Sequence, residues 1–324
     1  MGDVKPELLL VGGATDRMRG QLAELFNVHE DSALSDLRAF LEQRGHEISA
    51  VCVYGGASLP DGALAAMPNL KIISGYGVGY DGIPAEEAAS RGIMVTHTPD
   101  VLNEDVANLA LLLLLAVSRR LVRDDAWARS GNWESKGNAP LTRSIEGSTI
   151  GILGFGRIGE ALARKLEVFG VTIVYHQRNR KAESAYRYYG DLVEMARDID
   201  TLISIVPGGA STHHLINRSV IEALGPQGTL INIGRGTVVE ETELVAALRD
   251  GRLGAAGLDV FEHEPHVPEG LRDLENVVMT PHTGSATVET RRAMGDLTVE
   301  NLRRFFADGT VVTPVPECRD LLKA

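Results

Sequence analysis

The sequence predicts an α/β fold built from two doubly wound domains, each with a parallel sheet. Short apolar runs rich in strand-forming residues alternate with segments of helical spacing, which is typical of parallel sheets covered by helices on both faces. One such run passes through a glycine-rich turn directly into a helix. The length of 324 residues allows about two domains with a sizeable core.

The first alternating series extends to residue 99. Its glycine-rich stretch Ser74–Asp81 follows an expected strand, and alternate glycines there can turn backbone N–H groups toward an anion. A flexible turn explains the same residues equally well. The expected strands are Leu8–Val11, Ala50–Tyr54, Leu70–Ser74 and Gly92–Thr96, and the expected helices are Met18–Phe26 and Ser35–Arg44.

A long apolar helix is expected from Asn103 to about Leu121. Its all-round hydrophobicity fits a crossing between domains or a subunit interface. The longest apolar run, Leu109–Val117, is well short of the about 20 residues that a transmembrane helix needs. The polar residues 122–147 are expected to form a helix end and a loop into the second domain.

The strongest single motif is Gly154-x-Gly156-x-x-Gly159, which joins an expected strand to an expected helix. In this context the first glycine permits a tight turn and the second lets the backbone approach a pyrophosphate. The third lets the helix pack closely on the strand. The helix, which is expected to stop at Gly170, offers its N-terminal N–H groups and positive dipole end to phosphates. The motif therefore predicts a dinucleotide site.

The loop after the next strand, Val171–Tyr175, indicates which dinucleotide is bound. An NAD enzyme places an acidic residue there, on the ribose 2′-OH. The segment 176–181 instead contains three cations and two amide side chains and has no acid. Arginine can hold a 2′-phosphate through two hydrogen bonds, so the loop favours NADP over NAD. A solvated basic loop is the alternative.

Chemically notable residues follow the later strands of this second domain, and ligands bind at that edge of doubly wound sheets. Arg235, Glu264 and His282 are three of them. Histidine can supply the proton for reduction of a ketone, and a carboxylate on its other ring nitrogen stabilises the protonated ring. A guanidinium can clamp the carboxylate of a 2-oxo acid. Taken singly, each is more often a solvated, turn-forming or structural residue. The strands are expected at Thr201–Val206, Gly228–Ile233, Ala255–Val260 and Asn276–Thr280, with helices at Val220–Leu224, Glu241–Arg249 and Glu289–Phe306.

The composition limits the partners. The net charge of −12 argues against a nucleic acid or an anionic membrane surface. The two cysteines are too few for a disulfide framework, and Cys52 is expected to be a buried thiol. The start, Met1–Pro6, lacks a signal-peptide pattern, so a cytoplasmic location is expected. No metal site is expected.

The chain resembles the D-2-hydroxyacid dehydrogenase family over nearly its whole length, and most of all the glyoxylate/hydroxypyruvate reductase branch. The resemblance depends on specific motifs in the expected order. They are Val78-Gly79, Gly154–Gly159, Ile231–Gly236 (INIGRG), Gly257–Pro265 (GLDVFEHEP) and Pro281–Thr287 (PHTGSAT).

The resemblance implies a role for each matching residue. Arg235 would bind substrate, His282 would be the acid/base and Glu264 its partner, while the Val78 and Gly79 N–H groups would hold the substrate carboxylate. The implied cofactor residues are Gly154, Gly156, Arg157 and Ile158 at the pyrophosphate, Arg178, Asn179 and Arg180 at the adenosine phosphate, and Pro207, Ile233, Asp259 and Gly284 along the rest, with Asp259 near the nicotinamide amide.

The family pattern implies a Rossmann-type cofactor domain and a flavodoxin-like substrate domain, with the active site in the cleft between them. The expected substrate domain is 1–99 with 286–324, and the cofactor domain is 100–285. A homodimer across the long helix is also implied. The expected activity is NADPH-dependent reduction of glyoxylate, hydroxypyruvate or a similar small 2-oxo acid to the D-2-hydroxy acid. The alternatives are an NAD-dependent dehydrogenase of another 2-hydroxy acid or of phosphite, and a nucleotide-sensing regulator on the same fold.

Overall fold

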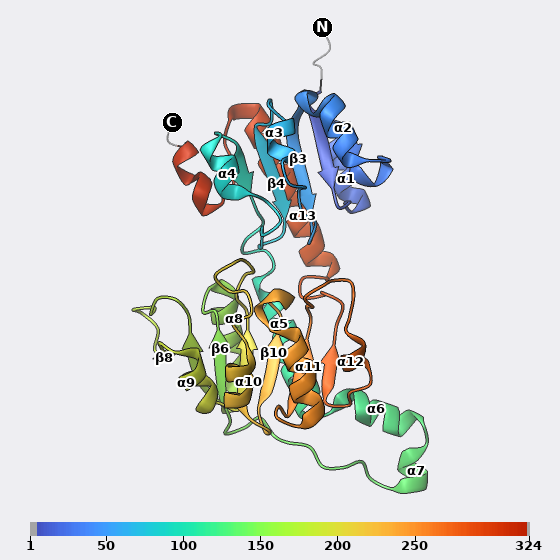
Figure 1. Cartoon of the computed structure of the whole chain (residues 1–324), viewed down its shortest axis with the longest axis vertical. Helices are drawn as coiled ribbons and strands as arrows, with labels where there is room; N and C mark the ends of the chain where they lie inside the picture. The colour runs from blue at the N-terminus through green and yellow to red at the C-terminus, as the bar shows by residue number, and fades with distance from the viewer. Residues whose placement is uncertain (1–4, 323–324) are drawn as a thin grey trace. The chain divides into compact units, whose positions relative to one another are not determined.

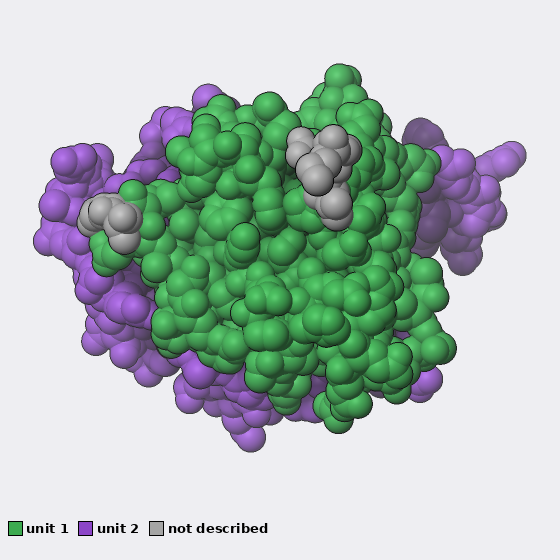
Figure 2. Space-filling model, turned by 90° about the horizontal axis from the view of Figure 1, so that it is seen from above, with its two compact units in different colours: residues 1–102, 287–324 green, residues 103–286 purple. Residues whose placement is uncertain are grey.

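The computed structural model describes residues 5–322. The ends of the expected substrate domain, 1–4 and 323–324, lie outside the described residues. Most of the N-terminal segment from which a cytoplasmic location is expected, residues 1–6, therefore also lies outside them. The chain forms two compact units, residues 1–102 with 287–324 and residues 103–286. Figure 1 traces the elements, and Figure 2 colours the two units.

Unit 1 contains a five-stranded sheet in the order β2-β1-β3-β4-β5, with every neighbouring pair parallel. This is the flavodoxin-like doubly wound order. The C-terminal helix α13 returns to the unit and packs on β4 and α1. The strands are β1 (Glu7–Val11), β2 (Asn27–Glu30), β3 (Ile48–Tyr54), β4 (Ile72–Tyr76) and β5 (Met94–Thr96); the helices are α1 (Asp16–Leu25), α2 (Leu37–Arg44), α3 (Ala63–Ala66), α4 (Ala85–Ser90) and α13 (Val288–Asp308).

Unit 2 contains a seven-stranded parallel sheet in the order β12-β11-β10-β9-β6-β7-β8. This order extends the Rossmann arrangement by one strand. The strands are β6 (Thr149–Leu153), β7 (Thr172–His176), β8 (Arg187–Tyr189), β9 (Thr201–Ser204), β10 (Thr229–Asn232), β11 (Ala255–Leu258) and β12 (Val277–Met279). The helices are α5 (Asn103–Ser118), α6 (Leu121–Arg129), α7 (Asn132–Lys136), α8 (Arg157–Leu166), α9 (Leu192–Arg197), α10 (Arg218–Leu224), α11 (Glu241–Asp250) and α12 (Glu269–Arg272).

Helices cover both faces of the seven-stranded sheet. Figure 1 shows α9, α10 and α11 in front of it and α5 behind, and α5 contacts α8, β10, β11 and β12. The sheet is buried between them, so β9 and β11 consist entirely of buried residues. None of the helices in residues 5–322 has the length and hydropathy to cross a membrane.

The α/β prediction is confirmed, with differences at the edges. Strands β2 and β8 were not expected, because each is short, lies at a sheet edge and has few buried residues, so it carries no continuous apolar pattern. The prediction of a helix end and loop for residues 122–147 was right for the loop at 137–147 and wrong for the residues before it, where α6 and α7 are separate helices joined through Gly131 at a φ of +74°. Cys52 is fully buried as predicted, and burial raises its pKa to about 12.

Candidate active site

The glycine turn between β6 and α8 lies where the strand order of the larger sheet reverses, between β6 and β9. Such a reversal is the usual ligand position in doubly wound sheets. Gly154 has a φ of +94°, and a Cβ there would lie 2.9 Å from Val206 Cγ1. A Cβ on Gly159 would lie 2.5 Å from the Gly154 carbonyl oxygen, so only glycine permits this close packing.

The second glycine of the motif has a different surrounding. A Cβ on Gly156 would meet nothing within 4 Å. The residue immediately precedes α8, whose first two residues are Arg157 and Ile158. The first N–H groups of a helix have no partner within it. The turn therefore combines open space with backbone donors, which is what an approaching phosphate group requires.

The basic loop after β7 presents two arginines. Arg178 and Arg180 are exposed, and neither side chain has a hydrogen bond or ion pair with any residue from 5 to 322. Lys181 differs, because its Nζ pairs with the Glu160 carboxylate. The carbonyl oxygen of Asn179 accepts a hydrogen bond from Gln177 Nε2 at 2.7 Å. Of the three cations in the loop, the two arginines are therefore the ones available to a ligand.

Arg235 is positioned by tightly packed neighbours on both sides. A Cβ on Gly234 would lie 2.5 Å from the Val206 carbonyl oxygen, and one on Gly236 would lie 1.9 Å from the Phe261 carbonyl carbon. The guanidinium Nη1 of Arg235 donates to the Gly234 carbonyl at 2.9 Å. The Gly-Arg-Gly sequence thus holds the arginine between the segments that follow β9 and β11.

Glu264 and His282 form a hydrogen-bonded pair. Glu264 Oε2 lies 2.7 Å from His282 Nδ1, and the Phe261 N–H donates to Glu264 Oε1 at 3.1 Å. Partial burial acts to raise the pKa of the Glu264 carboxyl. The hydrogen bond and charge of His282, the Phe261 N–H and the charge of Arg235 outweigh burial, so the pKa lies below its usual value. An ionised carboxylate on Nδ1 leaves Nε2 of the ring to exchange a proton with a substrate.

Asp259 holds the loop that carries His282. Its side chain is almost fully buried and accepts hydrogen bonds from the Thr283 N–H at 2.7 Å and the Gly284 N–H at 2.9 Å. The Asp259 carbonyl accepts from the His282 N–H at 2.8 Å. His282 has a φ of +53°, a conformation that costs a non-glycine residue energy and therefore needs such support.

The other predicted cofactor residues in unit 2 lie on the same edge of its sheet. Pro207 follows β9 and is exposed, and Ile233 follows β10 and is buried. Gly284 is buried, and a Cβ there would lie 3.3 Å from Asp259 Oδ2. All three follow carboxyl ends of parallel strands, as the sequence pattern indicates.

Val78 and Gly79 belong to unit 1, in the loop after β4. The Val78 carbonyl oxygen lies 2.9 Å from His97 Nδ1, which holds the loop in place. Within residues 5–322, neither the Val78 nor the Gly79 N–H has an acceptor. Two neighbouring backbone donors of this kind suit a carboxylate.

Two features near these loops were missed in the sequence. The buried Ser204 hydroxyl ends β9 and has no hydrogen-bond partner among the described residues. His214 Nε2 lies 2.7 Å from Glu262 Oε1, across a separation of 48 residues. A lone buried serine carries no periodic signal, and the histidine–glutamate contact depends on the packing of two loops.

Comparisons with known proteins agree with this geometry. The family model described as "D-isomer specific 2-hydroxyacid dehydrogenase, NAD binding domain" matches residues 111–284. The chain is 44% identical over 308 residues to glyoxylate/hydroxypyruvate reductase A of Arabidopsis thaliana, covering 95% of this chain and 98% of the relative. It is 48% identical over 278 residues to hydroxyphenylpyruvate reductase of Plectranthus scutellarioides, covering 86% and 88%.

A solved structure is similar over the whole chain. It is the NADPH-dependent glyoxylate/hydroxypyruvate reductase of Sinorhizobium meliloti in complex with NADP and malonate. The two chains are 45% identical and have a TM-score of 0.90, covering 97% of this chain and 98% of the other. Family and fold are therefore established together.

Proposed function

The chain belongs to the D-isomer specific 2-hydroxyacid dehydrogenase family, and on this premise we propose that it reduces a small 2-oxo acid with NADPH. The product is the D-2-hydroxy acid, and glyoxylate and hydroxypyruvate are the substrates proposed first. The names of the relatives support this substrate class. The single observation that carries the proposal is the 2.7 Å contact between Glu264 and His282, because ketone reduction needs a proton donor held in one orientation.

The residues of unit 2 fit a dinucleotide with a 2′-phosphate. When bound, NADPH supplies the hydride that reduces the ketone carbon. The open space at Gly156 and the start of α8 suit a pyrophosphate, for which Arg157 and Ile158 provide the backbone. Arg178 and Arg180 are unpaired within residues 5–322 and suit the 2′-phosphate, with Asn179 between them. The proposed remaining contacts are Gly154, Pro207, Ile233, Asp259 and Gly284.

We assign the 2-oxo acid to Arg235 and to the N–H groups of Val78 and Gly79. Arg235 forms charge-assisted hydrogen bonds to an oxygen of the 2-oxo acid and polarises the carbonyl, so charge that develops on that oxygen is stabilised. The Val78 and Gly79 N–H groups bind the carboxylate. Their lack of acceptors among the described residues supports this assignment.

His282 donates the proton to the carbonyl oxygen, from the ring nitrogen that Glu264 does not occupy. Glu264 fixes the ring orientation through Nδ1 and stabilises the protonated ring. The low pKa of Glu264 keeps its carboxylate charged at neutral pH. In the reverse direction the neutral ring accepts the proton of the hydroxy acid.

A turnover panel tests the proposed function. Glyoxylate, hydroxypyruvate, hydroxyphenylpyruvate and phosphite would each be assayed, the 2-oxo acids with NADPH or NADH and phosphite with the oxidised cofactors. We expect the highest kcat/KM with NADPH and one of the two small 2-oxo acids. Binding of NADPH without turnover would favour a nucleotide-sensing regulator. Turnover only with phosphite or only with NADH would favour an NAD-dependent dehydrogenase of phosphite or of another 2-hydroxy acid.

The division of labour and the assembly are part of the same proposal. Unit 2 serves as the dinucleotide-binding domain and unit 1 as the substrate domain, supported by the family match within residues 103–286. We also propose a cytoplasmic homodimer. Exposed apolar residues on α5 to α7 and the following segment support the dimer, because single copies would leave them in water. They are Leu112, Leu121, Val122, Trp133 and Leu141.

A further inference from the structure

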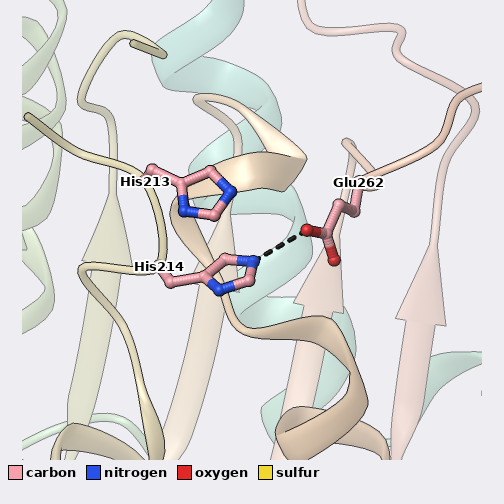
Figure 3. A group of neighbouring side chains, drawn as sticks. All are labelled: His213, His214 and Glu262. Atoms are coloured by element: carbon pink, nitrogen blue, oxygen red, sulfur yellow. Dashed lines mark hydrogen bonds and ion pairs between the residues drawn. The ribbon is translucent and has the colours of Figure 1, made fainter. Parts of the chain in front are cut away.

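Two loops of unit 2 bring two histidines and a glutamate together. His213 and His214 lie in the loop between β9 and α10, and Glu262 lies in the segment after β11. One ligand atom from each of the three side chains lies within 4.8 Å of the other two. Figure 3 shows both imidazole rings beside the Glu262 carboxylate, with His214 hydrogen bonded to it.

The backbone turns both rings to the same side. Consecutive side chains of an extended segment point to opposite faces. Here the rings of His213 and His214 are stacked, with centroids 3.9 Å apart and planes inclined by 26°. His214 has a φ of +49°, which is rare for a residue with a side chain. The His214 N–H donates to the Thr237 carbonyl at 2.9 Å and so holds this turn in place.

We propose that His213, His214 and Glu262 bind a single divalent transition-metal ion of the Zn²⁺ class. Two imidazole nitrogens and one carboxylate oxygen form the ligand set of many three-residue zinc sites, in which water occupies the fourth position. Ca²⁺ and Mg²⁺ prefer oxygen ligands, so the two nitrogens favour a Zn²⁺-class ion over them. The site is separate from the residues assigned to NADPH and to the 2-oxo acid.

Binding of an ion requires the ligand atoms to move from their present positions within 4.8 Å of one another. Ligand atoms around a tetrahedral zinc ion are about 3.3 Å apart, given bonds of about 2.0–2.1 Å. His214 Nε2 and Glu262 Oε1 are 2.7 Å apart, so the ion replaces the shared proton and separates them slightly. His213 is exposed, so its ring can turn toward the ion without disturbing the core.

A bound ion would connect two loops that frame the proposed active site. One is the segment from Pro207 to Ile216, and the other leads from Glu262 to Glu264, the partner of His282. Binding to the folded chain raises its stability by mass action. The proposed ion therefore links the two loops and stabilises the folded chain. The proposal does not depend on which 2-oxo acid is reduced.

The test measures Zn²⁺ binding to the full-length chain after removal of any affinity tag and of metal with a chelator. Equilibrium dialysis with elemental analysis gives stoichiometry and affinity, and thermal unfolding with and without Zn²⁺ gives a second readout. The variants are His213→Ala and Glu262→Gln. His266→Ala is the matched control, because this exposed histidine lies near Glu262 in the sequence but outside the three-residue set.

We expect one Zn²⁺ per chain and a higher Tm with Zn²⁺ for the wild type and for His266→Ala. We expect His213→Ala and Glu262→Gln to bind at least about tenfold more weakly and to lose the Tm increase. His213→Ala decides the matter if Glu262→Gln is unstable, because His213 is exposed. Wild-type binding no tighter than that of His213→Ala would overturn the proposal.

Discussion

Arg178 and Arg180 are the residues on which the cofactor preference depends. Their exposure and lack of partners in residues 5–322 leave both guanidinium groups for a 2′-phosphate. We predict that replacing both with Gln weakens NADPH binding and leaves NADH binding nearly unchanged, because only NADPH carries that phosphate. Each lost charge-assisted hydrogen bond costs at most roughly 1.5–3 kcal/mol.

Dissociation constants for both cofactors, measured by fluorescence titration, check this prediction. Arg38→Gln is a matched control, since Arg38 is an exposed arginine on α2 in the other unit. Equal losses of NADPH and NADH affinity in the double variant would show that the two arginines do not select the phosphate.

Arg235 is the side chain proposed to bind the 2-oxo acid. Lysine keeps the charge at this position but loses the planar fork that makes two parallel hydrogen bonds. We expect Arg235→Lys to lower kcat/KM for 2-oxo acids by orders of magnitude while the dissociation constant of NADPH changes little. An enzyme within a few fold of the wild type would remove Arg235 from the substrate site.

The sequence was informative about single residues where chemistry and spacing coincide. Arg235, Glu264 and His282 were selected because each follows a strand and has a side chain suited to ketone reduction. The 2.7 Å distance between Glu264 and His282 could not be derived in this way, because it depends on the φ of +53° at His282 and on the hydrogen bonds of Asp259. The His214–Glu262 contact had no signal at all.

At the scale of elements, the turn between β6 and α8 separates two roles of glycine. A Cβ on Gly156 meets nothing within 4 Å, and the residue has a φ of −88°, which alanine adopts freely. Gly156→Ala should therefore fold normally but lose NADPH affinity, since its methyl group occupies space needed by the pyrophosphate.

Gly159→Ala is the matched variant. Its Cβ would lie 2.5 Å from the Gly154 carbonyl oxygen, so helix and strand must move apart, and we expect a loss of roughly 1–3 kcal/mol in the free energy of unfolding. Urea unfolding and NADPH titration of both variants check the pair. If Gly156→Ala bound NADPH as the wild type does, the turn would not be the phosphate site.

Element types were predictable wherever a strand is buried on both faces. Strand β6, which precedes the glycine motif, and the strands β9 to β11 have continuous apolar runs. The edge strands β2 and β8 have few buried residues and were not predicted. The break between α6 and α7 depends on one glycine with a positive φ, and a single glycine in a polar stretch does not distinguish a loop from a turn between helices.

At the scale of the whole molecule, each sheet has a doubly wound order, and the α/β fold followed from the alternation of segments. The strand order could not be predicted from this alternation, because it depends on which strands pair and not on any one segment. A division into two domains was implied by the family resemblance, and the place of α13 in unit 1 comes from its contacts with β4 and α1, far apart in the sequence.

The oligomeric state is a separate prediction at this scale. Trp133 on α7 has an exposed fraction of 64%, and we expect a second copy to cover it. The wild type should sediment as a dimer, and Trp133→Glu should shift it toward the monomer, because a buried charge at an interface is costly. Val168→Glu is the control, as Val168 is 83% exposed outside α5 to α7 and should leave the dimer intact. A monomeric wild type would contradict the proposed assembly.

In the proposed mechanism, His282 is oriented by Glu264 and transfers the proton while NADPH reduces the ketone. The most direct measurement is kcat/KM against pH in both directions for the wild type, Glu264→Gln and His282→Ala. A protonated ring is needed for reduction and a neutral ring for oxidation, so the two directions should have opposite pH dependence. The lowered pKa of Glu264 keeps its carboxylate charged throughout the neutral range.

Removing that charge should destabilise the protonated ring. For Glu264→Gln, we predict that reduction fails at a lower pH than in the wild type and that oxidation begins at a lower pH. His282→Ala should lose roughly 10²–10⁴-fold in kcat/KM with NADPH binding retained. Unchanged profiles in a folded Glu264→Gln enzyme would contradict the account and reduce the 2.7 Å contact to a structural one.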